Sequence, residues 1–518
     1  MNRAVFVAAG ILISRISGFI RLRVFAYYFG LSDSADAFNA AFRIPNFLQN
    51  MFGEGALSAS FIPVYASLVS KGQRREADRV AGALLSLLAV VVSLVVLGAV
   101  LATPQLIAVI APGFTGAKRD LAIRLTRVLF PGAGLLVMSA WCLGILNSHH
   151  KFMLSYAAPV MWNACMVGTL VLFGRGTDLP ELAYYLAWGS VAGSGAQFLA
   201  QVPFVLRVAP DLRIAWDTSS EHVRTIVRNF VPVFVSRGVV QLSAYIDALL
   251  ASLLPTGAVS GISSAILLYT LPVSLFGISV AASELPAMSG AAALDSSGTE
   301  AVRARLDAGI RRIAFFVVPS SVAFLALGDV VAAAVLQTGR FTSADATYVW
   351  AILAGSSVGL VAMTLGRLYS STFYALRDTR TPLRFAVIRV LVTTGLGYAF
   401  AFPLPHLLGI DARWGAAGLT GSAGIAGWVE MFLLRGALKT RIGSVTMSLG
   451  YQATLWGAAL GSAAVGWGIK LLLPPVHPIV TGVAVLGPYA LTYGAVTLLL
   501  EVPEAQATLR RILRRGRN

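Results

Sequence analysis

The chain has 518 residues, of which 57% are hydrophobic and only 12% are charged, and its mean hydropathy is +0.76. Soluble globular domains carry about 25% charged residues, so this composition excludes an ordinary soluble protein and indicates a membrane protein. The formal net charge of +17 would also suit a nucleic-acid-binding protein, but most of the 40 Lys and Arg residues fall in alternate loops between apolar segments. No nucleic-acid partner is therefore predicted.

Fourteen apolar segments follow one another, each compatible with a transmembrane helix of roughly 20 residues. They cover residues 4–30, 36–69, 81–112, 121–147, 153–174, 182–206, 229–254, 262–290, 310–336, 346–375, 384–404, 414–434, 447–472 and 478–500. The sequence predicts an all-α polytopic membrane protein with about 14 transmembrane helices. The first segment carries Arg15 and Arg21 in its middle and lacks a small-residue cleavage site, so we expect it to be retained as a helix.

Basic residues mark the side of the membrane on which each loop lies, because Lys and Arg resist translocation out of the cytoplasm. One set of alternate loops holds few of them: Lys118, Arg119, Arg175, Arg340, Arg413 and Lys470. We therefore expect the other loops and both termini to be cytoplasmic. The basic tail at 502–518 is expected to lie against anionic lipid, and an RNA-binding arm is the alternative.

The chain contains traces of an internal duplication. Three short strings recur in order: Phe114–Ala117 as Phe341–Ala344, Gly134–Ser139 as Gly359–Thr364, and Ala59–Pro63 as Ala282–Pro286. Because the offset spans six helices, an even number, the copies are expected to be parallel repeats. Chance similarity among helices rich in Ala, Gly and Leu is the alternative.

The duplication predicts two six-helix lobes and two additional helices. The N-terminal lobe is assigned to residues 1–208, with helices 1–6, and the C-terminal lobe to residues 222–435, with helices 7–12. Helices 13 and 14 occupy 446–501, and 502–518 form the cytoplasmic tail. Two bundles around a central cavity can rock between inward-open and outward-open states.

The first helix carries charges in the middle of an apolar segment. Arg15 and Arg21 each cost about 2.5–3.5 kcal/mol at mid-membrane on insertion scales, so lipid exposure is unfavourable. Gly18 lies on the same stripe as Arg21 and permits a close approach. This pattern favours a cavity in which a guanidinium binds phosphate oxygens. The alternatives are a salt bridge to Asp33 or Asp36, or snorkelling of the side chain towards the interface.

The second apolar segment is expected to be a broken helix, because Pro45, Gly53 and Gly55 interrupt it. Broken helices in transporters serve as hinges and free backbone dipoles near the midplane. Its polar residues are therefore candidates for cavity or gate chemistry: Asp36, Arg43, Asn46 and Glu54. A purely structural kink is the alternative.

Asp247, in the seventh segment, is the candidate for binding a coupling ion, either sodium or a proton. A salt bridge to Arg237 or Arg389 is the alternative. Neither the five His residues nor Cys142 and Cys165 show metal-site spacing, and no GxxxxGK[ST] phosphate loop is present. The sequence therefore predicts a transporter rather than an enzyme, with no metal and no cofactor, driven by an ion gradient, the membrane potential or precursor supply.

Residues 14–65, which include SRISGFIRLRVF and SADAFNAAFRIPNFLQNMFGEGALSASFIPVY, closely resemble the opening of the bacterial lipid II flippases of the MurJ/MviN family. This family is part of the multidrug/oligosaccharidyl-lipid/polysaccharide exporter superfamily. The resemblance continues at 144–159, 251–269 and 373–384. It implies two six-helix lobes, a central cavity for the diphosphate and sugar headgroup, and a groove for the undecaprenyl tail along helices 13 and 14.

The resemblance also assigns residues. Arg15, Gly18 and Arg21 match the family's cavity positions on helix 1, and Asp36 and Glu54 match its acids on helix 2. Two departures from the family stand out. Gln49 and Asn50 occupy the place where the family commonly carries Arg, for which Arg43 is the candidate replacement, and Ile266 and Leu267 replace a charged pair on helix 8.

The function implied is a flippase that moves undecaprenyl-diphosphate-linked muropeptide, lipid II, from the cytoplasmic to the periplasmic leaflet by alternating access. The implied process is peptidoglycan synthesis, and the implied location is the bacterial inner membrane. Membrane lipids and cell-wall synthesis proteins are the implied further partners. The alternatives are an exporter of another lipid-linked oligosaccharide, a drug antiporter, or a non-transporting scaffold for cell-wall synthesis.

Overall fold

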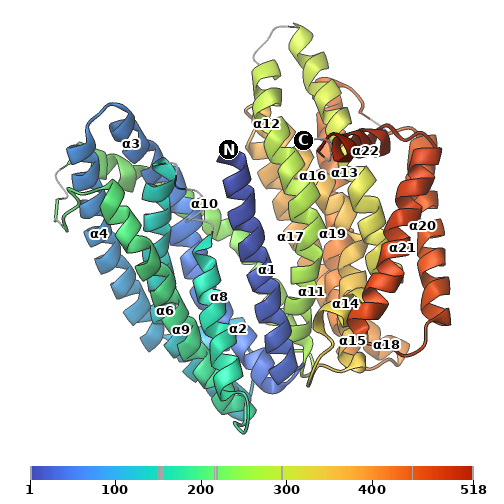
Figure 1. The fold of residues 1–518 in the computed structure, drawn as a ribbon, viewed down its shortest axis with the longest axis horizontal. Coiled ribbons are helices and arrows are strands. Elements are labelled where there is room, and N and C mark those ends of the chain that lie inside the picture. Colours follow the sequence, from blue (N-terminus) through green and yellow to red (C-terminus); the bar gives the residue numbers. More distant parts are fainter. Residues whose placement is uncertain are drawn as a thin grey trace. The chain divides into compact units, whose positions relative to one another are not determined.

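The computed structural model describes residues 3–149, 151, 157–214, 216–217, 220–292, 296–445 and 447–515. Within these residues the secondary structure is helical, apart from one isolated bridge between Thr338 and Phe341. The chain forms two compact units (Figure 1). Unit 1 contains Met1–Ser260 and Thr338–Phe341, and unit 2 contains Gly261–Gln337 and Thr342–Asn518.

Unit 1 is built from helices of the N-terminal half. They are α1 (Arg3–Phe29), α2 (Asp33–Gln49), the π-helix η1 (Asn50–Leu57), α3 (Ser58–Ser70), α4 (Arg74–Leu101), α5 (Thr103–Ile110), α6 (Gly116–Ser148), α8 (Pro159–Phe173), α9 (Leu179–Val208) and α10 (Glu221–Ser252). Helix α6 packs against α2, α4 and α9, and α1 packs against α8.

Unit 2 is built from the remaining helices. They are α11 (Ala258–Pro272), which starts in unit 1, the π-helix η2 (Val273–Ile278), α12 (Ser279–Ala292), α13 (Ser296–Ala326), α14 (Gly328–Leu336), α15 (Ser343–Val358), α16 (Leu360–Ala375), α17 (Arg380–Ala401), α18 (Pro403–Leu408), the 3-10 helix η3 (Ala412–Trp414), α19 (Gly415–Ile442), α20 (Leu449–Leu472), α21 (Pro478–Leu499) and α22 (Pro503–Arg515). Helices α17 and α19 pack side by side, and α20 pairs with α21.

Each predicted apolar segment coincides with a helix or a run of helices, which confirms the predicted all-α fold. Within the described residues, eight helices are long and apolar enough to cross a membrane, and the bent pair α15 and α16 makes a ninth. The other predicted segments contain α1, α2 with η1 and α3, α8, α9 and α10, which do not meet these criteria over their described residues.

The two units repeat the same order of elements. In unit 1 an α-helix leads into the π-helix η1 and then α3, and in unit 2 α11 leads into the π-helix η2 and then α12. Asn50 and Val273, where the two π-helices begin, are offset by 223 positions, as are Pro63 and Pro286 in the repeated string. Thr115 and Thr342 likewise precede the first residues of α6 and α15.

The predicted lobes and the compact units divide the chain at different places, because they are defined in different ways. Helix α10, the first helix of the predicted C-terminal lobe, packs against η1 and α3 within unit 1. Contacts group helices by proximity, whereas the lobes were inferred from sequence repeats. The assignment of 1–208 and 222–435 to two repeats therefore stays a prediction.

The loop between α16 and α17 shows how a short motif fixes the geometry of a bundle. The carboxylate of Asp378 accepts hydrogen bonds from the backbone amides of Arg380 and Thr381 and from the Thr381 hydroxyl, and it pairs with Arg441 at 2.6 Å. The hydrogen bonds from Thr381 are the main cause that lowers the pKa of Asp378 to about 2. Asp378 therefore stays ionised at physiological pH and holds α17 and α19 at this end.

Candidate functional site

The Arg21 side chain is held by helix α8. Its Nε donates a hydrogen bond to Asn163 Oδ1 at 2.9 Å, and its guanidinium carbon lies 4.9 Å from the centre of the Trp162 ring. Asn163 Nδ2 in turn donates to Ser17 Oγ at 2.9 Å. These contacts fix the plane of a half-buried guanidinium. Within the described residues its two terminal nitrogens have no hydrogen-bond acceptor, so they can receive an anion.

Gly18 and Arg15 lie about one and two turns, respectively, before Arg21 on α1. The Arg15 side chain is exposed, and a Cβ placed on Gly18 would meet no atom within 4 Å. Packing inside unit 1 therefore does not require a glycine at position 18. The open space beside Gly18 suits the approach of a ligand to this face of α1.

Arg43 on α2 interacts electrostatically with Asp247 and Tyr245 of α10. The Tyr245 ring also stacks edge-on against Phe47, with 5.1 Å between ring centres. Sequence reasoning gave Asp247 two alternative partners, Arg237 and Arg389. Arg389 instead pairs with Glu430 at 3.3 Å, and the side chain of Arg237 lies outside the described residues.

Asp36 is the most strongly bound acid of unit 1. Its carboxylate accepts hydrogen bonds at 2.8 Å from Lys118 Nζ, the Gly257 amide and the Ser260 amide, and at 2.7 Å from the Ser260 hydroxyl. Gly257 has a φ of +93°, which a residue with a side chain rarely adopts, and this turn aims its amide at Asp36. The carboxylate is 1% exposed, so its acceptor positions are used by the protein itself.

The predicted break in the second apolar segment takes the form of a π-helix. Pro45 lies inside α2, and the chain continues without interruption through η1 into α3. Gln49 and Asn50, at the family's missing arginine, lie where α2 ends and η1 begins. The side chain of Glu54, within η1, lies outside the described residues. π-Helical turns are frequent at functional sites, so η1 remains a candidate hinge.

The structure thus places the candidates in three separate sets of contacts. Arg21 meets α8, Arg43 meets α10, and Asp36 meets Lys118 and the segment around Gly257. Sequence reasoning missed Trp162 and Asn163. The pattern that could have revealed them is the single amide within the otherwise apolar run PVMWNACMVGTLVLF. Within the described residues no group of three His, Cys, Asp or Glu side chains is placed to hold a metal ion.

A family model described as "Lipid II flippase MurJ" matches residues 25–485 of the chain. The match begins beyond the arginines of α1 and includes the candidate residues of α2 and α10. The chain is 30% identical over 446 residues to a lipid II flippase MurJ of Burkholderia cenocepacia, over 85% of this chain and 84% of the relative. It is 32% identical over 429 residues to a probable lipid II flippase MurJ of Rhizobium tropici, over 81% and 78%.

Solved structures share the fold. One, titled as a lipid II flippase MurJ in an inward closed conformation, has a TM-score of 0.78 at 22% identity and covers 96% of this chain and 98% of its own. Another, an inward-facing multidrug resistance transporter of the MATE family, has a TM-score of 0.67 at 20% identity, over 82% and 96%. At these identities the likeness concerns the fold alone.

Proposed function

Because the chain belongs to the MurJ family of lipid II flippases, we propose that it moves lipid II from the cytoplasmic to the periplasmic leaflet, with the arginines of α1 binding the diphosphate. Arg21 carries the proposal most directly. Its guanidinium is oriented by Asn163 and Trp162. Among the described residues no acceptor bonds its terminal nitrogens, which are therefore available to a ligand. A planar fork of this kind matches phosphate oxygens better than an ammonium does.

Transport by alternating access fits the repeated architecture. Each unit contains a long helix interrupted by a π-helical segment, η1 or η2, and such segments are sites at which transport helices bend. We assign the energy source to an ion gradient, with sodium or a proton as the coupling ion, or to the membrane potential. The protein is a transporter in this proposal and carries out no covalent chemistry.

The shared fold makes a drug antiporter the second candidate, because a multidrug transporter of the MATE family has the same architecture. Cationic drugs would be repelled by the guanidinium groups of Arg15 and Arg21, whereas a diphosphate would be attracted. Flipping of labelled lipid II in proteoliposomes separates the two. Protein-dependent flipping that a cationic drug does not inhibit supports the proposal, and drug efflux without lipid II movement would replace it.

The direction of transport depends on the orientation of the chain. Loops rich in Lys and Arg should be cytoplasmic, because positive residues resist translocation. Reporters should be cytoplasmic when fused after Lys71, Arg213, Arg305, Arg380 and Lys439, and periplasmic near Gly257 and Phe341. Paired alkaline phosphatase and fluorescent-protein fusions measure this directly. The reverse pattern would overturn the orientation and the cytoplasmic placement of both termini.

Substitution of Asp247 tests whether this residue binds the coupling ion. If its carboxylate binds sodium or a proton, Asp247→Asn should change the dependence of lipid II flipping on sodium or pH, because the amide carries no charge. Removing the attraction between Asp247 and Arg43 is a separate consequence, so Arg43→Gln serves as the matched variant. If Asp247→Asn flips lipid II with unaltered ion dependence, Asp247 only balances the charge of Arg43.

A further inference from the structure

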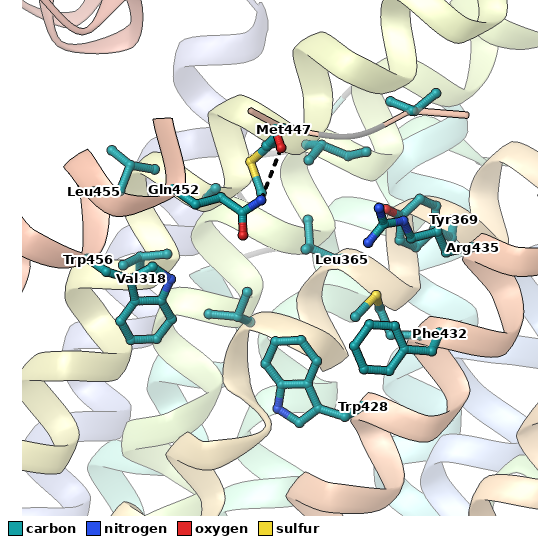
Figure 2. A pocket seen from close by; sticks show the side chains of 15 residues that line it. Val318, Leu365, Tyr369, Trp428, Phe432, Arg435, Met447, Gln452, Leu455 and Trp456 are labelled. Atoms are coloured by element: carbon teal, nitrogen blue, oxygen red, sulfur yellow. Dashed lines mark hydrogen bonds between the residues drawn. The ribbon is translucent and has the colours of Figure 1, made fainter. Parts of the chain in front are cut away.

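We propose that a cavity inside unit 2, between α13, α16, α19 and α20, binds an anionic glycerophospholipid, with its phosphate on Arg435 and part of one acyl chain in the cavity. The cavity has a volume of about 170 Å³. Arg435 and Tyr369 lie together on one side, Trp456 and Val318 lie on the other, and Trp428 and Phe432 lie between them (Figure 2).

The lining of this cavity is suited to a hydrocarbon chain. Most of its side chains are aliphatic or aromatic, contributed by all four helices and by the loop between α19 and α20. Trp428 uses its Nε1 to donate to the Val358 carbonyl at 2.8 Å, and Gln452 donates to the Met447 carbonyl at 3.0 Å. These two donors are therefore occupied, which leaves a mainly apolar space with a guanidinium at its edge.

Arg435 differs from two neighbouring arginines, Arg441 and Arg389, in having no ion-pair partner among the described residues. Arg441, further along α19, pairs with Asp378 at 2.6 Å, and Arg389 of α17 pairs with Glu430 at 3.3 Å. Arg435 is half-buried and makes no hydrogen bond or ion pair within the part of the chain that is described. A half-buried cation next to apolar surface favours a ligand that joins a negative charge to a hydrocarbon chain.

The basic helix α22 lies close to the cavity in unit 2. Helix α22, with the sequence PEAQATLRRILRR, packs against α13 and α21, and its Glu504 accepts a hydrogen bond from Tyr451 at 2.8 Å (Figure 1). Tyr451 directly precedes Gln452 of the cavity lining. Basic pockets between transmembrane helices on the cytoplasmic side are typical sites for anionic lipid headgroups.

The choice of a phospholipid rests on the proposed function, because that function already assigns the single diphosphate of lipid II to the arginines of α1. The cavity is also smaller than the roughly 300 Å³ at which pockets for whole drug-sized ligands begin, so it excludes a disaccharide-peptide headgroup. A segment of an acyl chain fits, and the leaflet supplies such chains in excess. The undecaprenyl chain of the substrate is the competing occupant.

The test compares lipid retention by four purified proteins in detergent: wild type, Arg435→Ala, Val445→Trp and Lys439→Ala. Native mass spectrometry measures retention of dioleoylphosphatidylglycerol and dioleoylphosphatidylcholine. Val445 lines the cavity from the loop, so its replacement by tryptophan fills the space and leaves Arg435 in place. Lys439 is an exposed cation one turn further along the same helix and is the matched control.

We expect wild type and Lys439→Ala to retain phosphatidylglycerol in preference to phosphatidylcholine, and Arg435→Ala to bind it about tenfold more weakly, since one charge-assisted contact is lost. Val445→Trp should show a similar loss of phosphatidylglycerol binding. If Arg435→Ala does not fold, the Val445→Trp result alone tests the proposed lipid site. Equal retention of both lipids, or normal retention in both cavity variants, would overturn the proposal. So would displacement of phosphatidylglycerol by equimolar undecaprenyl phosphate. Lipid II binding to Arg21→Ala reports separately on the proposed function.

Discussion

Replacing Arg21 by alanine is expected to nearly abolish growth of a strain that depends on this protein as its lipid II flippase. The guanidinium is held in place by Asn163 and Trp162, so its removal leaves the diphosphate without an oriented donor pair. A charge-assisted hydrogen bond contributes about 1.5–3 kcal/mol, so lipid II affinity should fall roughly 10- to 100-fold. Complementation measures the first effect, and binding of lipid II to purified variants measures the second.

Two further variants separate binding from a structural role. Arg21→Lys keeps the charge but replaces the planar guanidinium fork by a single ammonium nitrogen, so it should be intermediate. Asn163→Leu keeps the guanidinium and removes its orienting acceptor, so it should weaken lipid II binding less than Arg21→Ala does. Arg15→Ala is expected to behave like Arg21→Ala. If both alanine variants complement fully and bind lipid II normally, the arginines are structural and the anion site is wrong.

Asp36→Ala should strongly destabilise the protein even when no lipid II is present. The change leaves the Lys118 ammonium, two backbone amides and a hydroxyl without their shared buried acceptor. Breaking a buried ion pair by removing one partner costs about 3–5 kcal/mol. Thermal unfolding of the purified, substrate-free variant should therefore show a clear fall in Tm, together with lower yield of folded protein.

The neighbouring acid supplies the control for Asp36. Asp33 pairs with the same ammonium at 2.8 Å and accepts from Thr256, but its side chain is 61% exposed. Exposed pairs contribute about 0–1 kcal/mol, so Asp33→Asn should leave Tm almost unchanged. A substrate-free Tm that is normal in Asp36→Ala, combined with lost lipid II binding, would instead assign Asp36 directly to the ligand.

The sequence was sufficient for the helices because they depend on patterns along the chain. Apolar length predicted a helix or a run of helices in each segment, and one of the three repeated strings has the same offset as the two π-helical segments. The π-helix itself was not predicted. Pro45, Gly53 and Gly55 indicated only that the second segment would be interrupted, and local composition does not distinguish a kink from an added residue in a turn.

Side-chain partners were harder to predict because they depend on helix packing. Arg21 was recognised by the cost of a charge in an apolar segment, but nothing along the sequence connects it with Asn163, which lies 142 residues away. Asp247 was recognised for the same reason. Of its two candidate partners, Arg389 pairs with Glu430, and the side chain of Arg237 lies outside the described residues. Asp36 was a candidate for cavity or gate chemistry, and nothing along the sequence connects its carboxylate with Lys118 and the turn at Gly257, more than 80 and 200 positions along the chain.

The paired π-helical segments bear on how the two halves of the chain are related. A turn closed by hydrogen bonds between residues five apart holds one residue more than an α-helical turn, so a single inserted codon is enough to create one. Asn50 and Val273 begin such segments at the same offset as the repeated proline. An insertion that came before a duplication would leave a π-helical segment at one offset in both copies, whereas a later insertion would leave it in one copy only.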